Sequence, residues 1–322
     1  MQLKIDTRSA SGAILGFIVA LALGLQPAAA ASRLDDCKAQ TATDWTVCGN
    51  AAFDEGRYDD AMAAYNQALR LDPRAWDTLF NRGTLAMGLG DNAAAIRDFD
   101  QALAIASDHC PEICFNRATA HYRMLRFPEA IADYSAVLTL LPENDQALFQ
   151  RGICYSLVGN NDAALRDFAE VTRLKPGYVA AYSQRATLYT RMGNDDAALR
   201  EDEKALAVEP TYADAYYDRA GIAWRRGNFQ DAIRDYTTAI GFYAEAANGP
   251  SERVSRWYGQ GAHAQPMRLG VSVRLIDLYL ADAYYWRSRA WRSLGDTAKA
   301  DIDLADALRV DPNVGARIGD EP

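Results

Sequence analysis

Ala147–Pro176 has the sequence ALFQRGICYSLVGNNDAALRDFAEVTRLKP, and this stretch decides the fold. It reads as two amphipathic helices joined by a short turn. Gly152 is a small residue at which two helix backbones can approach closely, and Phe168 is a bulky residue for the core between them. Gly159 ends the first helix because glycine tolerates the left-handed C-cap, and Pro176 closes the second because it has no N–H. Such a hairpin cannot bury its apolar face alone, so the stretch predicts neighbouring copies of itself.

The same pattern recurs about every 34 residues along the chain. The seven units cover residues 42–75, 76–109, 111–144, 145–178, 179–212, 213–246 and 281–314. In each unit one position of the second helix, the core plug, carries a side chain meant for the interior: Tyr65, Phe99, Tyr134, Phe168, Asp202, Tyr236 and Leu304. A glycine stands at the turn of every unit except the third, which has Leu125 there.

These small, bulky and turn positions together resemble those of the tetratricopeptide repeat (TPR) family, and the resemblance covers most of residues 42–314. It implies an all-α fold, a right-handed TPR superhelix (α-solenoid) of about seven helix-turn-helix repeats. The first helices would line a concave groove. Asp202 departs from the pattern by replacing an aromatic plug, so we expect the fifth unit to pack loosely.

The residues before the repeats predict export. Residues 1–30 are interpreted as a signal peptide, because a basic start with Lys4 and Arg8 precedes the apolar run Gly12–Leu25 and the alanines at 28–31. An N-terminal membrane anchor is the alternative. We expect a periplasmic location, with extracellular space as second choice, and no integral membrane span after signal cleavage. Residues 31–41 form an N-terminal lead-in.

Residues 42–246 hold units one to six, and an insertion at 247–280 separates them from unit seven at 281–314. We expect the second helix of unit six to run on towards Asn248. A loop, Gly249–Gly270, would follow, and Val271–Leu280 would extend the first helix of unit seven. A degenerate eighth repeat is the alternative. The C-terminal tail is residues 315–322. The short stretch after Pro312 offers little to cover the last helix pair, and a solenoid needs a polar cap at its ends.

Composition and motifs argue against several functions. The formal net charge of −9 disfavours sequence-independent binding of nucleic acid. The chain carries no phosphate-binding loop, zinc-protease helix or nucleophile elbow, and it has only three histidines. We therefore expect no enzyme activity, no cofactor and no metal site.

One charged pair recurs with the repeats. Units two to seven carry an arginine on the first helix and an acid sixteen residues later: Arg82–Asp98, Arg117–Asp133, Arg151–Asp167, Arg185–Glu201, Arg219–Asp235 and Arg287–Asp303. Unit one lacks both members. The joint absence predicts a physical ion pair between the two helices, with a structural rather than a ligand-binding role.

The groove is the first candidate for function. The resemblance assigns to it the first-helix residues Phe80, Asn81, Phe115, Asn116, Tyr122, Arg123, Phe149, Gln150, Gln184, Arg191, Tyr217, Trp224, Arg225 and Tyr285. Amides can bond an extended peptide backbone, aromatic rings supply contact area, and arginine selects acidic groups. The expected partner is therefore a protein or peptide, and an acidic one is favoured. The alternative is that these rings pack between adjacent first helices. The lysine-rich clamp of some co-chaperone TPR domains is not matched.

The insertion is the second candidate, because Arg253, Arg256, Trp257 and Tyr258 are residue types that often anchor interfaces. The alternative is that Trp257 folds back onto the end of unit six.

Five cysteines complete the candidates. A bridge between Cys37 and Cys48 would staple the lead-in to the first helix, as in secreted TPR proteins that the chain resembles. A local bridge between Cys110 and Cys114 is feasible if Cys110 lies outside the helix, and a metal site with His109 would lack a fourth ligand. Cys154 is expected to be a buried thiol.

The function predicted from the sequence is a protein–protein interaction scaffold or adaptor in the cell envelope that binds a partner segment in the groove. The first alternative is a structural or assembly protein that self-associates through the array ends and residues 249–270. The weaker alternative is a non-catalytic subunit of an envelope enzyme or secretion complex.

Overall fold

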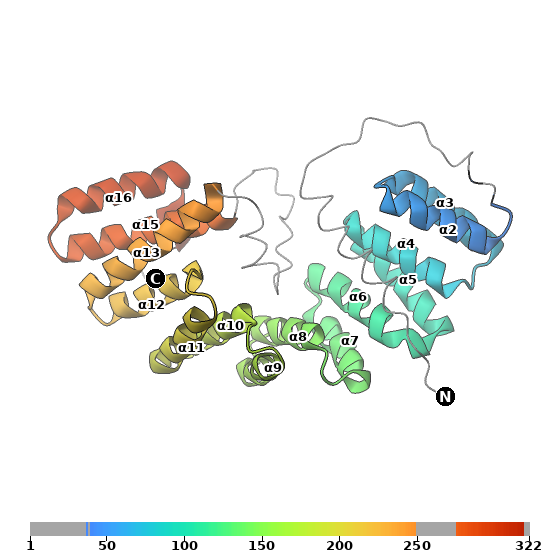
Figure 1. Cartoon of the computed structure of the whole chain (residues 1–322), viewed down its shortest axis with the longest axis horizontal. Coiled ribbons are helices and arrows are strands. Elements are labelled where there is room, and N and C mark those ends of the chain that lie inside the picture. The colour runs from blue at the N-terminus through green and yellow to red at the C-terminus, as the bar shows by residue number, and fades with distance from the viewer. Residues whose placement is uncertain (1–36, 38, 249–274, 319–322) are drawn as a thin grey trace. The chain divides into compact units, whose positions relative to one another are not determined.

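The computed structural model describes residues 37, 39–248 and 275–318, and within them the chain forms fifteen α-helices, one short 3-10 helix and no strand (Figure 1). The first helices of the seven units are α2 (Ala42–Asp54), α4 (Trp76–Gly88), α6 (Cys110–Arg123), α8 (Asp145–Leu157), α10 (Val179–Arg191), α12 (Ala213–Arg225) and α15 (Leu275–Ser293). The second helices are α3 (Tyr58–Leu71), α5 (Asn92–Ile105), α7 (Phe127–Leu140), α9 (Asn161–Leu174), α11 (Asp195–Val208), α13 (Phe229–Asn248) and α16 (Thr297–Val310). The all-α repeat fold is therefore confirmed.

In the second and fourth units the core plug packs against a glycine of the first helix. A Cβ atom added at Gly152 would lie 2.7 Å from the ring of Phe168, and one added at Gly83 would lie 2.8 Å from the ring of Phe99. Real Cβ atoms do not come so close, so glycine is required where the ring crosses the first helix. Both rings are fully buried. The small and bulky positions found in the sequence are thus two halves of one contact.

The turns between paired helices share one backbone conformation. Six turn glycines have φ between 73° and 92°, a left-handed region that glycine enters without a steric penalty. In unit three Leu125 takes the same role at φ 60°. In four units an Asn or Asp then caps the second helix, and the Asn160 side chain accepts a hydrogen bond from the Ala163 N–H at 3.3 Å.

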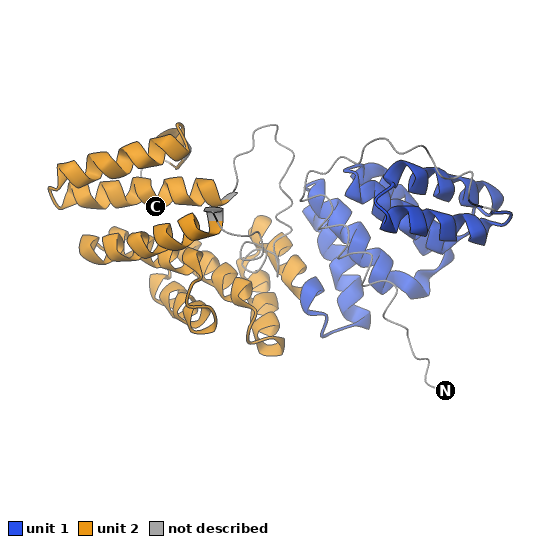
Figure 2. Cartoon of the chain, turned by 45° about the horizontal axis from the view of Figure 1, so that its top comes forward, with its two compact units in different colours: residues 1–147 blue, residues 148–322 orange. Residues whose placement is uncertain are grey.

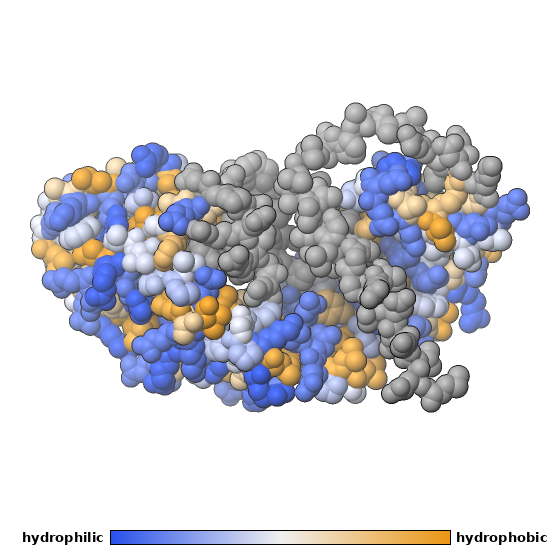
Figure 3. Space-filling model, viewed as in Figure 1, coloured by the Kyte–Doolittle hydropathy of each residue, from blue (hydrophilic) through white to orange (hydrophobic). Residues whose placement is uncertain are grey.

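The chain divides into two compact units, unit 1 (residues 1–147) and unit 2 (residues 148–322) (Figure 2). Below, the numerals 1 and 2 always denote these two compact units, and the seven repeats are named by ordinal words. The core of the first unit centres on plugs such as Tyr65 and Phe99. The core of the second unit includes Tyr236, Tyr243 and Trp286, so it is richer in large aromatic side chains. Hydrophilic and hydrophobic residues are interspersed over the described part of the face shown in Figure 3.

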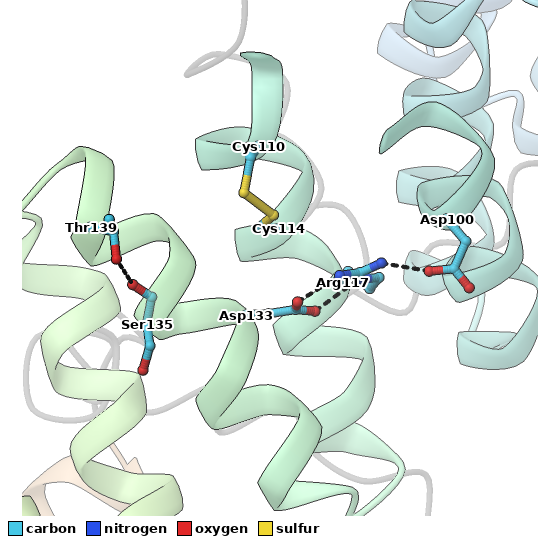
Figure 4. Close-up of a disulfide and its surroundings, with 7 residues drawn as sticks. All are labelled: Asp100, Cys110, Cys114, Arg117, Asp133, Ser135 and Thr139. Atoms are coloured by element: carbon cyan, nitrogen blue, oxygen red, sulfur yellow. Dashed lines mark hydrogen bonds and ion pairs between the residues drawn. A yellow bond between two sulfur atoms is a disulfide. The ribbon is translucent and has the colours of Figure 1, made fainter. Parts of the chain in front are cut away.

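The predicted arginine–acid pairs form in all six repeats that carry them. Arg117 shows the arrangement: its Nε and Nη2 donate to the two carboxylate oxygens of Asp133 at 2.8 and 2.6 Å (Figure 4). Its Nη1 also donates to Asp100 on the preceding helix α5 at 2.6 Å. The ion pair is bidentate in every repeat that carries it except the fifth. There the Arg185 guanidinium contacts Glu201 once, at 3.1 Å, and Lys204 binds the same carboxylate.

The end of the array corrects one expectation. The stretch after Pro312 does cover the last helix pair, because it forms α17 (Val314–Ile318), in which Val314 is completely buried beside Ala281 and Ala307. Before it, α15 and α16 lie side by side in Figure 1. Helix α13 ends at Asn248 and α15 begins at Leu275; the remainder of the predicted insertion lies outside the described residues. None of the described helices is both long enough and apolar enough to cross a bilayer.

Candidate functional site

The first helices of unit 1 are joined by a series of polar contacts. The Asn81 amide donates to the Asn50 side-chain oxygen at 3.0 Å, and the Asn116 amide donates to the Thr84 hydroxyl at 3.2 Å. Asn116 is buried, whereas Asn81 is half-buried. These amides were predicted to bond a peptide backbone. Asn116 instead links two successive first helices, because its donor is already used in the interior.

The aromatic candidates of unit 1 pack on the core plugs. Phe80 lies 6.0 Å from Phe99 between ring centroids, and Phe115 lies edge-on to Tyr134 at 5.4 Å. Both first-helix rings stay half-buried. Their outer edges therefore remain available, while their inner faces complete the core as the alternative interpretation expected.

Arg123, on a first helix of unit 1, forms no ion pair with a carboxylate of the described residues. Its Nη1 donates to the backbone oxygen of Met87 at 2.8 Å, and its buried Nε has no hydrogen-bond partner. Burial lowers the pKa of Arg123, yet an arginine stays protonated at any physiological pH. Tyr122 precedes it and packs against Phe127 at 5.9 Å. Arg123 is thus a half-buried positive charge with donors to spare.

Two candidates of unit 2 are not surface residues. Phe149 is 2% exposed and packs between Phe168 at 5.4 Å and Tyr178 at 5.1 Å. Gln150 is also buried. The expectation that they contact a partner does not fit this burial, because neither side chain is exposed. We leave them out of the binding surface proposed below.

The polar candidates further along unit 2 differ in whether their side chains already have a hydrogen-bond or ion-pair partner. Gln184 is half-buried and makes no side-chain hydrogen bond to any described residue. Arg191 is exposed and donates to the Ser156 hydroxyl at 2.6 Å. Arg225 is bound to Asp195 at 2.9 Å, so its charge is already neutralised.

The aromatic candidates of unit 2 form a connected set. Tyr217 lies edge-on to Tyr236 at 5.6 Å, and Trp224 lies edge-on to Trp286 at 5.4 Å. Tyr285 packs on the same Trp286 at 5.5 Å. Tyr217, Trp224 and Tyr285 are only half-buried, and the buried indole N–H of Trp224 has no hydrogen-bond partner within the described residues. The structure therefore brings these three together around one tryptophan and one tyrosine of the core.

Sequence reasoning missed one feature of this surface, a pair of carboxylates on α11 and α12. Asp202 is 0% exposed, and neither of its carboxylate oxygens has a hydrogen-bond partner among the described residues. Asp218 on α12 is half-buried and acts on it electrostatically. A signal was available, because Asp202 replaces an aromatic plug and Asp218 stands where other repeats carry Asn or Gln.

Both expected cysteine pairs form, but Cys110 is the first residue of α6 and does not lie outside the helix as the local bridge was expected to require. Cys37 is bonded to Cys48 with Cα atoms 6.3 Å apart. Cys110 is bonded to Cys114 with Cα atoms 5.0 Å apart (Figure 4), and both distances are within the usual range. Cys154 is a buried free thiol, and burial raises its pKa to about 12. No cluster of metal-ligating side chains occurs among the residues described.

The second candidate surface, with Arg253, Arg256, Trp257 and Tyr258, lies outside the described residues.

Comparison with known proteins agrees with the geometry. Three family models described as tetratricopeptide repeat match residues 49–112, residues 115–179 and 183–251, and residues 281–314. The chain is 34% identical over 96 residues to the DnaJ homolog subfamily C member 7 homolog of Schizosaccharomyces pombe, covering 29% of this chain and 20% of that protein. It is 32% identical over 108 residues to the STIP1 homolog of Dictyostelium discoideum, covering 34% and 19%. The chain thus spans about a fifth of the length of these relatives.

Solved structures share the fold. A tetratricopeptide repeat protein from Parabacteroides merdae superposes with a TM-score of 0.57 at 21% identity, covering 85% of this chain and 94% of that one. The C-terminal part of a TPR protein from Cytophaga hutchinsonii gives 0.61 at 15% identity, covering 83% and 96%. With its paired helices, its plugs set against small residues and these matches along most of its length, the chain belongs to the tetratricopeptide repeat family.

Proposed function

We propose that this protein is a non-catalytic interaction scaffold that binds an extended segment of a partner protein along its first helices. Membership of the TPR family supports the general role, because repeats of this kind stack into surfaces that hold other proteins. Fold alone does not fix a partner, so the binding chemistry has to come from particular side chains.

The observation that carries the proposal is the state of Arg123. Its guanidinium is half-buried on a first helix and bound only to one backbone oxygen, and its Nε is buried without a partner. A buried hydrogen-bond donor without an acceptor lowers the stability of the fold by about 1–3 kcal/mol, and by more when the donor is charged. A carboxylate from a partner would pair with the guanidinium in a charge-assisted bond, through donors that the Met87 oxygen does not use. The half-buried rings of Tyr122 and Phe115 on the same helix would flank the bound segment.

A matched pair of labelled extended peptides tests this proposal. The two peptides differ only in a central glutamate or glutamine, and their binding to the purified chain is measured by fluorescence polarisation. We expect the glutamate peptide to bind about tenfold more tightly, and Arg123→Gln to remove that preference. Arg97→Gln, an exposed arginine on the second helix α5, is the control and should keep it. Equal binding of both peptides to the wild type would refute the proposed role of Arg123.

We further propose that the protein is exported to the periplasm. The apolar run Gly12–Leu25 followed by small residues supports a signal peptide, and the bridges Cys37–Cys48 and Cys110–Cys114 suit an oxidising compartment. Intact-mass measurement on protein from fractionated cells tests this. A cleaved N-terminus near residue 31 with both bridges present is the expected result, and an uncleaved, fully reduced chain would contradict it.

A structural role by self-association has less support, because α17 covers the end of the last repeat.

A further inference from the structure

A cavity of about 410 Å³ lies in unit 1 between the second helices α3 and α5, and it is called the α3–α5 cavity here. Its volume is within the range of ligand-binding pockets. Its apolar side is made by Leu69, Pro73 and Leu79, and its polar side by Asn66, Arg70 and Gln101. The three polar residues are exposed, so a ligand can reach them from solvent.

Arg70 brings to this cavity a positive charge that forms no ion pair with a carboxylate of the described residues. The same position of the fourth repeat is Arg173, which pairs with Glu170 three residues earlier at 2.6 Å. The seventh repeat has the same kind of pair at 3.0 Å. Three residues before Arg70 stands Gln67, a neutral amide. The charge of Arg70 is therefore left for another acid.

Asn66 is a second amide at a position where another repeat has an acid. In the third repeat Asp100 accepts a hydrogen bond from Nη1 of Arg117 at 2.6 Å, and Asn66 accepts the equivalent bond from Nη1 of Arg82 at 2.8 Å. That bond uses the side-chain oxygen of Asn66, so both of its amide N–H groups stay available as donors. The Gln101 amide has no hydrogen-bond partner among the described residues. None of the described residues that line the cavity is acidic.

We propose that the α3–α5 cavity binds an aliphatic side chain and the carboxylate next to it, such as a leucine–glutamate pair, from a partner protein. The carboxylate pairs with Arg70 and accepts hydrogen bonds from the amides of Asn66 and Gln101. The aliphatic side chain packs on Leu69 and Pro73. Charge complementarity favours this occupant over a basic or a purely apolar one, because the cavity is positive in a chain whose net charge is −9.

The cavity lies beyond the proposed function, because it belongs to second helices and shares no lining residue with the first-helix site at Arg123. It also needs both parts of its ligand. A glutamate peptide that lacks the aliphatic side chain therefore reports on Arg123, and the two sites can be measured separately.

The other repeats suggest variants that neutralise the cavity and keep the fold. Gln67→Glu gives Arg70 the acid one turn earlier that the fourth repeat has. Asn66→Asp places at the cavity the carboxylate that the third repeat has at the equivalent position. Both variants copy an arrangement that the chain already folds with, and circular dichroism should show unchanged helix content. Both should weaken binding, because the new carboxylate competes with or repels that of the ligand.

Fluorescence polarisation with labelled alanine-rich peptides tests the cavity. Three peptides carry Leu-Glu, Leu-Gln or Ala-Glu at the centre, and the purified full chain carries Arg123→Gln so that the first-helix site does not contribute. We expect the Leu-Glu peptide to bind about fivefold more tightly than either of the others. Arg70→Gln, Gln67→Glu and Asn66→Asp should each remove most of the preference for glutamate. Arg173→Gln, at the matched position of the fourth repeat, should leave it unchanged.

Several results would overturn this assignment. Equal binding of the Leu-Glu and Leu-Gln peptides would mean that the occupant is not acidic, and a glutamate preference that survives Arg70→Gln would place the acid elsewhere. Loss of the preference in Arg173→Gln would show a general charge effect. If the wild type prefers glutamate but the Arg123→Gln chain does not, the cavity is wrong and the proposed function stands. If Arg123→Gln changes nothing while Arg70→Gln removes the preference, the cavity stands and the proposed role of Arg123 is wrong.

Discussion

At the scale of single residues, the recurring arginine–acid pair is the clearest link between sequence and structure. Arg151 donates to both oxygens of Asp167 at 2.8 and 2.7 Å, and the carboxylate is almost completely buried. A buried pair is weak support for stability as a whole, yet breaking it from one side leaves a charge with no partner. The pair therefore fixes which helices meet more than it adds net stability.

A double-mutant cycle on Arg151 and Asp167 measures this coupling. We expect each single change, Arg151→Met or Asp167→Asn, to lower the free energy of unfolding by about 2–4 kcal/mol, since each leaves a buried partner unpaired. The double variant should lose about 1–3 kcal/mol less than the sum. Urea denaturation followed by circular dichroism gives the values. Strict additivity would show that the two side chains act independently.

Asp202 gives the stability of unit 2 a pH dependence. Its pKa is about 9 in the folded chain, well above the ordinary value of 3.8, so the folded state holds a proton that the unfolded state has lost between these two values. Stability must then fall as the pH rises across that range. This sign is opposite to that of an ordinary salt-bridged aspartate.

The variant Asp202→Asn should remove that dependence, because it keeps the shape of the protonated acid. We expect thermal unfolding to show that the variant gains stability relative to the wild type by about 1.4 kcal/mol for each pH unit between pH 5 and pH 9, which is about 5 kcal/mol over that range. Glu203→Gln, which changes an exposed carboxylate on the same helix, serves as the control. A wild type whose stability relative to Asp202→Asn stays constant over this pH range would rule out the proposed protonation.

At the scale of helices and turns, Leu125 stands out. It ends the first hairpin helix of the third repeat at φ 60°, where the other six repeats have glycine, and its side chain is 73% exposed. The exposed side chain gains little from burial, while its Cβ meets the steric cost of the left-handed region, about 1–2 kcal/mol. The turn is therefore formed by tertiary packing and against the preference of its own residue.

Leu125→Gly should stabilise the chain by roughly 0.5–1 kcal/mol, less than the full steric cost because glycine is also freer in the unfolded state. The midpoint of thermal unfolding reports the change. Ile302→Gly is the matched control: this residue is 63% exposed in the middle of α16, and the same substitution should destabilise by about 0.5 kcal/mol there. Destabilisation by Leu125→Gly would show that the leucine side chain contributes to packing after all.

At the scale of the whole molecule, the repeats made the fold predictable because they align the chain with itself. Their fixed positions in the 34-residue repeat were enough to find three sets of residues: Phe99, Phe168 and their equivalents, the turn glycines, and the arginine–acid pairs. The cap α17 could not, since five residues carry no helical period. The burial of Phe149 agrees with the alternative that these rings pack within the array, but its extent could not be predicted, because a repeat position does not say how far neighbouring rings close over it.

The candidate site was predictable only in part, and for a related reason. The repeat register placed Arg123, Tyr217 and Trp224 on first helices, which the structure bears out. The pairing of Asp202 with Asp218 depends on two departures from the repeat that face each other across α11 and α12. Each departure is visible in the sequence, but their electrostatic contact exists only once the helices are packed.

Site-specific photocrosslinking in cells that produce the protein tests the central claim, that the first helices hold a partner segment, most directly. A photoreactive residue is placed at Gln184 on α10, which has no hydrogen-bond partner among the described side chains, and in separate proteins at the exposed residues Arg166 on α9 and Glu203 on α11. The account predicts a discrete crosslinked partner from the first-helix position and none from the two second-helix positions. A partner captured from Arg166 or Glu203 and not from Gln184 would contradict it.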